Sequence, residues 1–373
     1  MPTETQPTVD PAVEPTVEPE CRHVLTAPVT SAVAATRPRL ADQAPTTLSG
    51  RFREAIRYIR GRGALEIGLI TLAVIAGFVA VSAAFPDSFA FLDPANLQGV
   101  IFQSIPVYAI LAIGVGILMI AGEFDLSLGA NFALSAIVFI HVANTAGWLL
   151  GLLAAMGTGI AIALINGLVV VITKIPSFIA TLGLGFFWTG MAYLINGTMP
   201  AILTSDQTTT NIFAGDFGVI RSQLIWLLVI GVIGWFFLHR HKKGNAIYAV
   251  GGNASAAKAI SISPARIKLL CFGILGALVA IAGVMTAVRT TSIQPGTTET
   301  YTLMSVAAAV VGGCALTGGR GSIFGMIIGA ALIQLIQDGL ILANAPGFYV
   351  QLFVGLLIVV AAVANKLFEG KAS

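Results

Sequence analysis

Two acidic side chains, Glu123 and Asp125, interrupt long apolar runs of this chain with almost no loop between those runs. A charge at the depth of a bilayer costs about 3 kcal/mol, so such a residue is a candidate functional group. Asp125 either accepts hydrogen bonds in a polar pathway or caps the helix that follows it, and the sequence favours neither. Ser127, Asn131 and Ser135 then recur at intervals of four and form one polar stripe. In a membrane helix such a stripe faces protein or a wet cavity.

A second polar group lies near the end of a later apolar run, where Gln334, Gln337 and Asp338 share one helical face. The carboxylate of Asp338 either belongs to a pathway through the membrane or is an ordinary ionisable group near the outer interface. The candidate pathway residues are Asp125, Ser127, Asn131, Gln334 and Asp338.

Other kinds of chemistry lack the residues they need. The four histidines are scattered, the three cysteines form no Cys-x-x-Cys pair, and no Gly-x4-Gly-Lys-Ser/Thr phosphate loop occurs. We therefore expect no catalytic residue, no metal site, no cofactor and no ATP hydrolysis on this chain.

The composition predicts a membrane protein. Hydrophobic residues make up 56% of the 373 positions, charged residues only 10%, and the mean hydropathy is +0.90. Soluble domains carry about 25% charged residues, so this mixture cannot cover a water-exposed surface. The net charge of +3 comes from basic residues at the ends of apolar runs, a pattern that does not indicate nucleic-acid binding.

The apolar runs predict an all-α, polytopic integral membrane protein with about ten transmembrane helices. The expected spans are 64–85, 98–121, 125–143, 147–172, 175–195, 223–239, 266–289, 301–317, 321–342 and 346–366. The distribution of Lys and Arg places both termini in the cytoplasm. The breaks at 122–125 and 317–321 are very short, which indicates broken or re-entrant helices as an alternative to plain spans.

The same patterns divide the chain into segments. We expect a disordered cytoplasmic tail at 1–50, a basic juxtamembrane segment at 51–63, a transmembrane domain at 64–366 and a cytoplasmic tail at 367–373. The longest outside loop, 196–222, is either a solvated connector or part of a docking face for an outside partner.

A short soluble-looking segment, 239–268, lies between two apolar runs and is expected in the cytoplasm. Gly251-Gly252 predicts a hinge, Asn253 can cap a short helix of small residues, and Ser263-Pro264 can start the next helix. Because a two-turn helix is unstable alone, we expect membrane helices and a partner to hold it. The alternative is an ordinary interfacial loop. The candidate coupling residues, within a coupling loop at 240–265, are Gly251, Gly252, Asn253, Ala256, Ala257, Lys258 and Ile262.

A glycine-rich segment follows at 310–329. Its glycines permit close helix crossing or a tight re-entrant turn, and we favour this structural role over contact with substrate. The glycines concerned are Gly312, Gly313, Gly318, Gly319, Gly321, Gly325 and Gly329.

Four motifs resemble, in order and spacing, the permease subunits of ribose/xylose/arabinose-type ABC sugar importers. They read GEFDLSLGANFALSA, PSFIATLGLGFFWTGMAYLINGTMP, YAVGGNASAAKAISI and VVGGCALTGGRGSIFGMIIGA. The resemblance covers residues 64–366. This chain departs from the family pattern in two places: Glu123 and Phe124 replace a Gly and an Ile, and Asp338 stands where Asn is frequent.

The resemblance implies a permease in the cell membrane that works beside a cytoplasmic ABC ATPase subunit and an extracellular or periplasmic sugar-binding protein. It also implies a second permease copy, most simply a homodimer, surrounded by lipid. Segment 251–262 matches the family's cytoplasmic coupling loop. Import of branched-chain amino acids or nucleosides is an alternative within the class. An ion-coupled secondary transporter, driven through Glu123, Asp125 or Asp338, is an alternative outside it.

Overall fold

A computed structural model describes residues 64–204, 207–218, 220–296 and 299–369. The tail at 1–50, the basic segment at 51–63 and the last residues of the predicted C-terminal tail, 370–373, lie outside this part of the chain.

The first half of the described chain consists of successive helices, most of which coincide with apolar runs of the sequence. They are α2 (Ala64–Ala84), α3 (Pro94–Gly99), the π-helical turn η1 (Val100–Ser104), α4 (Ile105–Ile120), α5 (Leu128–Ala146), α6 (Trp148–Thr173) and α7 (Ser177–Asn196). The predicted span 98–121 is therefore not one continuous α-helix, because η1 interrupts it.

The second half adds eight helices of different lengths. These are α8 (Gln207–Ala214), α9 (Ser222–Arg240), α10 (Lys242–Gly252), α11 (Ala254–Ala259), α12 (Pro264–Thr290), α13 (Glu299–Val311), α14 (Ile323–Leu342) and, last, α15 (Gly347–Glu369). Within the described residues, eight helices are long and apolar enough to cross a membrane, which confirms the all-α, polytopic class. The total of about ten spans and the side of the termini stay predictions.

The predicted span 301–317 is wrong at its end. Helix α13 stops at Val311, after 13 residues, and an irregular segment follows. Gly313, Gly318 and Gly319 adopt positive φ angles of 85°, 89° and 75° there. A left-handed backbone is a conformation that glycine adopts without penalty and that ends a helix. The glycine-rich sequence therefore breaks the helix several residues earlier than its apolar composition indicated.

The core is built around α4 and α12. Nearly every residue of α4 is buried, and Phe132 on α5 and Phe272 on α12 are fully buried as well. By contrast, α2 and α7 expose large apolar side chains such as Leu69, Phe186 and Leu194. Apolar faces that water would penalise are expected where lipid is the solvent.

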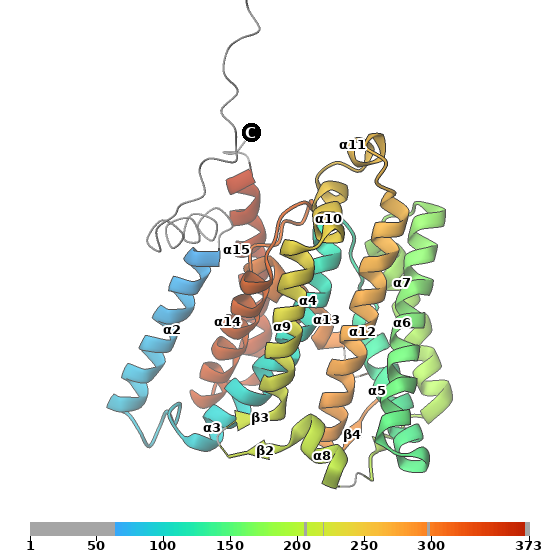
Figure 1. Cartoon of the computed structure of the whole chain (residues 1–373). Helices are drawn as coiled ribbons and strands as arrows, with labels where there is room; N and C mark the ends of the chain where they lie inside the picture. The colour runs from blue at the N-terminus through green and yellow to red at the C-terminus, as the bar shows by residue number, and fades with distance from the viewer. Residues whose placement is uncertain (1–63, 205–206, 219, 297–298, 370–373) are drawn as a thin grey trace, which may run out of the picture. The chain divides into compact units, whose positions relative to one another are not determined.

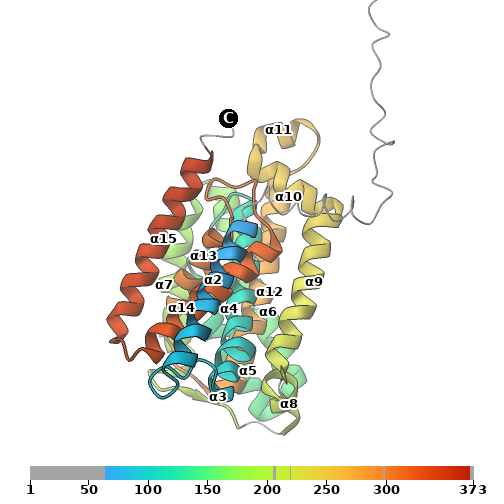
Figure 2. The ribbon, with the colours of Figure 1, turned by 90° about the vertical axis from the view of Figure 1, so that its left-hand side faces the viewer.

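The two ends of the helical array carry different elements (Figures 1 and 2). At one end, α10 and α11 extend beyond the long helices, on the same side as the end of α15. At the other end lie α8 and four two-residue strands. Strand β1 (Ala201–Ile202) pairs antiparallel with β4 (Ser292–Ile293), and β2 (Asp216–Phe217) pairs antiparallel with β3 (Ile220–Arg221). The segment 196–222, which the sequence predicts as an outside loop, thus contains local structure that its polar composition does not predict.

Candidate functional site

The short helix α11 forms as the sequence predicts. The side chain of Asn253 accepts a hydrogen bond from the N–H of Ala256 at 2.9 Å, which confirms it as the N-cap. Most residues of the helix are exposed, including Ala256 and Lys258. Ile260, directly after it, is 69% exposed. An apolar side chain so exposed at the tip of the segment is suited to contact another protein.

Two features of this segment differ from the prediction. Ala257, a candidate coupling residue, is only 2% exposed, so its side chain packs inside the chain and is not available to a partner. Gly251 and Gly252 lie in the last turn of α10 and form no flexible hinge. A helix does follow Ser263-Pro264, but the Ser263 side chain makes no capping hydrogen bond. Ile262 is half-buried beside Ala257, whose carbonyl accepts its N–H.

The backbone of Gly251 packs directly against two other segments of the chain. A Cβ atom placed on Gly251 would overlap the carbonyl oxygen of Ile120, at the end of α4, and would come within 2.6 Å of the Gly319 nitrogen. The N–H of Gly319 donates to that same carbonyl at 2.9 Å. A Cβ on Gly318 would meet the Gly251 oxygen at 2.9 Å and the Cα of Gly122 at 3.0 Å. Only residues without side chains allow backbones this close.

Three segments that the sequence separates therefore meet at one point. They are the break after α4 at Gly122, the end of α10 at Gly251 and the turn at Gly318–Gly319. We call this contact the glycine junction, comprising Gly122, Gly251, Gly318 and Gly319. It connects α10 and α11 directly to both breaks in the membrane helices. The other glycines of the third segment pack α13 against α14: a Cβ on Gly312 or Gly325 would overlap the other residue's carbonyl oxygen, and one on Gly329 that of Ala308. A Cβ on Gly321 would meet the Cys314 sulfur at 2.8 Å.

The polar stripe of α5 is buried and hydrogen-bonded. Asn131 donates from Nδ2 to the Gly159 carbonyl at 3.0 Å, and its Oδ1 accepts from the Ser135 hydroxyl at 2.9 Å. Ser127 accepts from Asn166 Nδ2 at 2.6 Å. The stripe thus faces α6, which confirms that it faces protein.

Asn166 and Trp188 are parts of this network that the sequence analysis missed. The indole N–H of Trp188 donates to Asn166 Oδ1 at 2.9 Å, so one amide links α5 to α7. Asn166 is fully buried in an apolar run of α6. A lone amide in such a run is the signal that could have pointed to it.

Asp125 lies at the start of the network. Its Oδ1 accepts from the Ser127 N–H at 2.8 Å and from the Ser127 hydroxyl at 2.5 Å. Its Oδ2 is buried without a hydrogen-bond partner. Helix α5 starts at Leu128 with Ser127 in the N-cap position, so Asp125 fixes the turn before the helix and does not itself occupy the cap.

The second polar group is bonded to a different element. Asp338 accepts from Asn96 Nδ2 at 3.0 Å, and Gln334 donates to Gln337 at 3.2 Å. Asn96 belongs to α3, which lies at the end of the array opposite to α10 and α11 (Figure 1). No hydrogen bond given for the described residues joins this pair to the Asp125 network.

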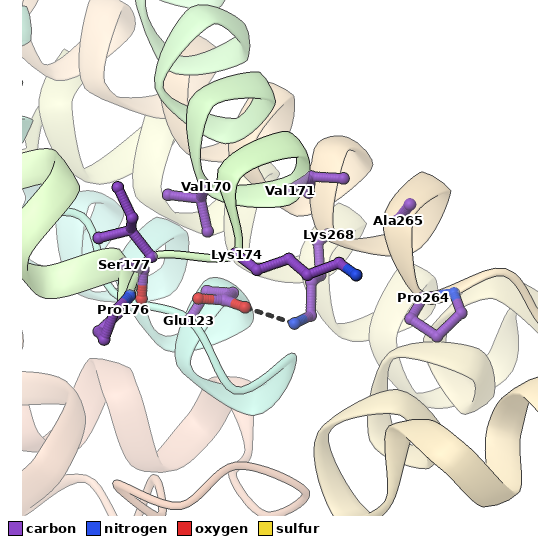
Figure 3. A pocket seen from close by; sticks show the side chains of 10 residues that line it. Glu123, Val170, Val171, Lys174, Pro176, Ser177, Pro264, Ala265 and Lys268 are labelled. Carbon is purple, nitrogen blue, oxygen red and sulfur yellow. Dashed lines mark hydrogen bonds and ion pairs between the residues drawn. The ribbon is translucent and has the colours of Figure 1, made fainter.

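A pocket of about 340 Å³ opens beside the first break (Figure 3). It lies between the end of α6, the start of α7 and the start of α12. Glu123 and Lys268 form an ion pair on its wall. Its lining residues are Glu123, Val170, Val171, Lys174, Ile175, Pro176, Ser177, Pro264, Ala265 and Lys268. Among the described residues no group of three or more metal-ligating side chains occurs.

The apolar helices, the breaks and the projecting α10–α11 segment are features of a multi-pass permease of the cell membrane. The chain belongs to the family described as "Branched-chain amino acid transport system / permease component", whose model matches residues 97–362.

Curated relatives extend this match over most of the chain. A ribose import permease protein of Escherichia coli (strain K12) is 30% identical over 86% of this chain and 98% of its own length. An L-arabinose ABC transporter permease protein of Azospirillum brasilense is 31% identical over 80% of this chain and 86% of its own. An autoinducer 2 import system permease protein of Enterobacter sp. (strain 638) is 32% identical over 76% of this chain and 84% of its own length. No solved structure matches this chain.

Proposed function

We propose that this chain is the membrane-spanning subunit of an ATP-driven monosaccharide importer. The ribose and arabinose names of its relatives support a sugar as substrate. The chain carries no phosphate-binding loop, so a partner ATPase supplies the energy and a binding protein delivers the sugar.

The observation that carries the proposal is the glycine junction. Helices α10 and α11 project from the array, and the backbone of Gly251 rests directly on Ile120 and Gly319. A displacement of α11 and α10 would therefore be transmitted to the end of α4 and to the turn between α13 and α14 through backbone contacts, without an intervening flexible side chain. Packed elements of this kind shift between discrete arrangements, which is what alternating access requires.

The contact with the ATPase is assigned to the exposed part of α11 and the residues around it: Gly252, Asn253, Ala256, Lys258 and Ile260. Ala257 and Gly251 act behind this surface, because one is buried and the other touches α4. The Asp125 network and the Asp338–Asn96 pair are the candidate polar groups of the pathway.

A matched pair of variants tests the proposed ATPase contact on α11. Ile260→Glu places a charge on the exposed tip beside α11, and Ile202→Glu places the same charge at a 65% exposed position at the opposite end. We expect Ile260→Glu to lower co-purification of the ATPase at least tenfold, because a desolvated unpaired charge costs several kcal/mol at an interface. Ile202→Glu should leave co-purification unchanged. Equal co-purification of the ATPase with the two variants would exclude this contact surface.

Transport by the reconstituted complex tests the substrate class. Labelled ribose or L-arabinose should be taken up, and labelled leucine should not. Uptake of leucine alone would favour the family's branched-chain amino acid members and contradict the sugar proposal.

A further inference from the structure

The pocket in Figure 3 has a position that the transport cycle does not explain. Its floor is the short link Lys174–Pro176 between α6 and α7, both of which are candidate membrane spans. A link of three residues between two spans lies at the level of the lipid headgroups. The pocket includes the first residues of α12, at the end of the array where α10 and α11 lie (Figure 1), the side expected in the cytoplasm.

The charge of this pocket is positive. Lys174 and Lys268 line it with a single acid, Glu123, which pairs with Lys268. Lys174 is exposed, and its ammonium group makes no ion pair or hydrogen bond given for the described residues. The pocket therefore presents one uncompensated ammonium group, next to a second whose partner is on its edge.

Two helix starts add to this charge. Pro264 and Ala265 begin the 27-residue α12, and Ser177 begins the 20-residue α7; neither helix has a side chain that caps its first N–H groups. Each such end carries the equivalent of about half a positive charge. The carboxyl end of α6, at Lys174, carries a partial negative charge of similar size at the same pocket and offsets one of these helix starts. An anion in the pocket would meet the other helix start and Lys174 together.

One wall of the pocket is apolar and continues outward. Val170, Val171 and Ile175 line it, and Ile172 and Phe178 beside them are 72% and 53% exposed. A small hydrated anion gains nothing from such a wall. A phosphate group attached to acyl chains uses both parts, with its headgroup in the pocket and its chains along α6 and α7.

We propose that this pocket binds the headgroup phosphate of an anionic phospholipid of the cytoplasmic leaflet. Basic pockets between membrane helices on that side are suited to anionic headgroups. Lys174 is the primary contact, and Glu123 restrains binding because it neutralises Lys268.

Lipid retention by the purified full-length chain tests the site. Phosphatidylglycerol or phosphatidylcholine is added to the protein in detergent, and bound lipid is counted by native mass spectrometry. We expect preferential retention of phosphatidylglycerol. Lys174→Gln should weaken that retention about fivefold, the effect of one basic contact at a membrane surface. Glu123→Gln should strengthen it by a similar factor, because Lys268 is released.

Lys242→Gln is the control, since Lys242 is also exposed on the same side but lies outside the pocket. It should leave retention unchanged. Equal retention of the two lipids, or no effect of Lys174→Gln, would overturn the proposal. Displacement of phosphatidylglycerol by inorganic phosphate at equal concentration would show a site for a small anion and would also overturn it. If Glu123→Gln does not fold, Lys174→Gln alone decides the question, since its side chain is exposed.

None of these outcomes depends on transport. A lipid site that is present in a chain that fails to import sugar would refute the proposed function alone, and the reverse result would refute the lipid site alone.

Discussion

At the residue scale, the structure narrows what Asp125 does. One carboxylate oxygen receives both the N–H and the hydroxyl of Ser127, and the other has no partner. The side-chain amide of asparagine would keep an oxygen that accepts from Ser127 but would carry no charge. The methyl group of alanine would keep neither the accepting oxygen nor the charge. Substitutions at Asp125 can therefore distinguish the effect of its negative charge from the effect of its hydrogen-bond acceptor.

We predict that Asp125→Asn keeps near-normal transport and thermal stability. Its amide oxygen still accepts from Ser127, and the unpartnered oxygen is replaced by an NH2 group. Asp125→Ala should lower the free energy of unfolding by about 1–3 kcal/mol, because the buried Ser127 N–H then loses its acceptor. Thermal unfolding in detergent and sugar uptake measure the two effects. A folded, transport-dead Asn variant would show that the charge itself serves the pathway.

Gln223, in the first turn of α9, is a second informative residue. It is fully buried, and neither side-chain atom has a hydrogen-bond partner. Gln98 offers a matched comparison, because its Oε1 accepts from Arg221 Nη2 at 3.0 Å.

We predict that Gln223→Leu raises the free energy of unfolding by about 1 kcal/mol or more, since it removes an unsatisfied polar group of similar size. Gln98→Leu should lower it, because Arg221 then loses an acceptor. The unfolding midpoints of the two variants measure the difference. A lower midpoint for Gln223→Leu would reveal a partner for that amide.

At the element scale, the glycine junction connects α10 to α4 and to the turn before α14. Gly251 and its neighbour Gly252 allow this contact to be tested one residue at a time. A Cβ on Gly251 would overlap the Ile120 carbonyl, whereas one on Gly252 would meet no atom within 4 Å.

We predict that Gly251→Ala destabilises the chain by about 1–3 kcal/mol, the usual cost of overpacking, and severely lowers sugar uptake. Gly252→Ala should unfold like the parent protein. Unfolding midpoints and uptake at equal membrane abundance are the measurements. Uptake by Gly251→Ala equal to that of the parent protein would contradict a coupling role for the junction.

The sequence predicts the elements better than it predicts their contacts. Apolar runs of about 20 residues and the Asn253 cap follow from local patterns, so most of the long helices and α11 are found where expected. The end of α13 differs from the prediction, because the sequence stays apolar up to Leu316 whereas the backbone leaves the helix at Gly312–Gly313. The meeting of Gly122, Gly251 and Gly318 is a tertiary contact between segments far apart in sequence, and no local pattern specifies it.

The same limit applies to the candidate site. The stripe Ser127, Asn131 and Ser135 is visible as a periodicity, but its partners Asn166 and Trp188 lie on other helices. The sequence indicates Ala257 as a coupling residue but does not reveal which side of a two-turn helix packs inward, and Ala257 is buried. Burial and partners became evident once the helices were assembled.

At the scale of the whole molecule, the helical array has two different ends. Helices α10 and α11 lie at one end of the array, and α8 with the four short strands lies at the other (Figures 1 and 2). We expect the ATPase at the first end and the sugar-binding protein at the second. A homodimer, implied by the family resemblance, would place two such arrays side by side in the membrane.

The central claim is that this chain imports a monosaccharide at the expense of ATP bound by a partner. The most direct test measures labelled ribose or L-arabinose uptake in cells that express the complete importer, with ATP depleted and a proton gradient imposed. The account predicts that uptake stops on ATP depletion and returns when ATP is restored, and that Ile260→Glu abolishes uptake in both states. Uptake that persists without ATP and follows the proton gradient, in the parent and in the Ile260→Glu variant alike, would contradict it.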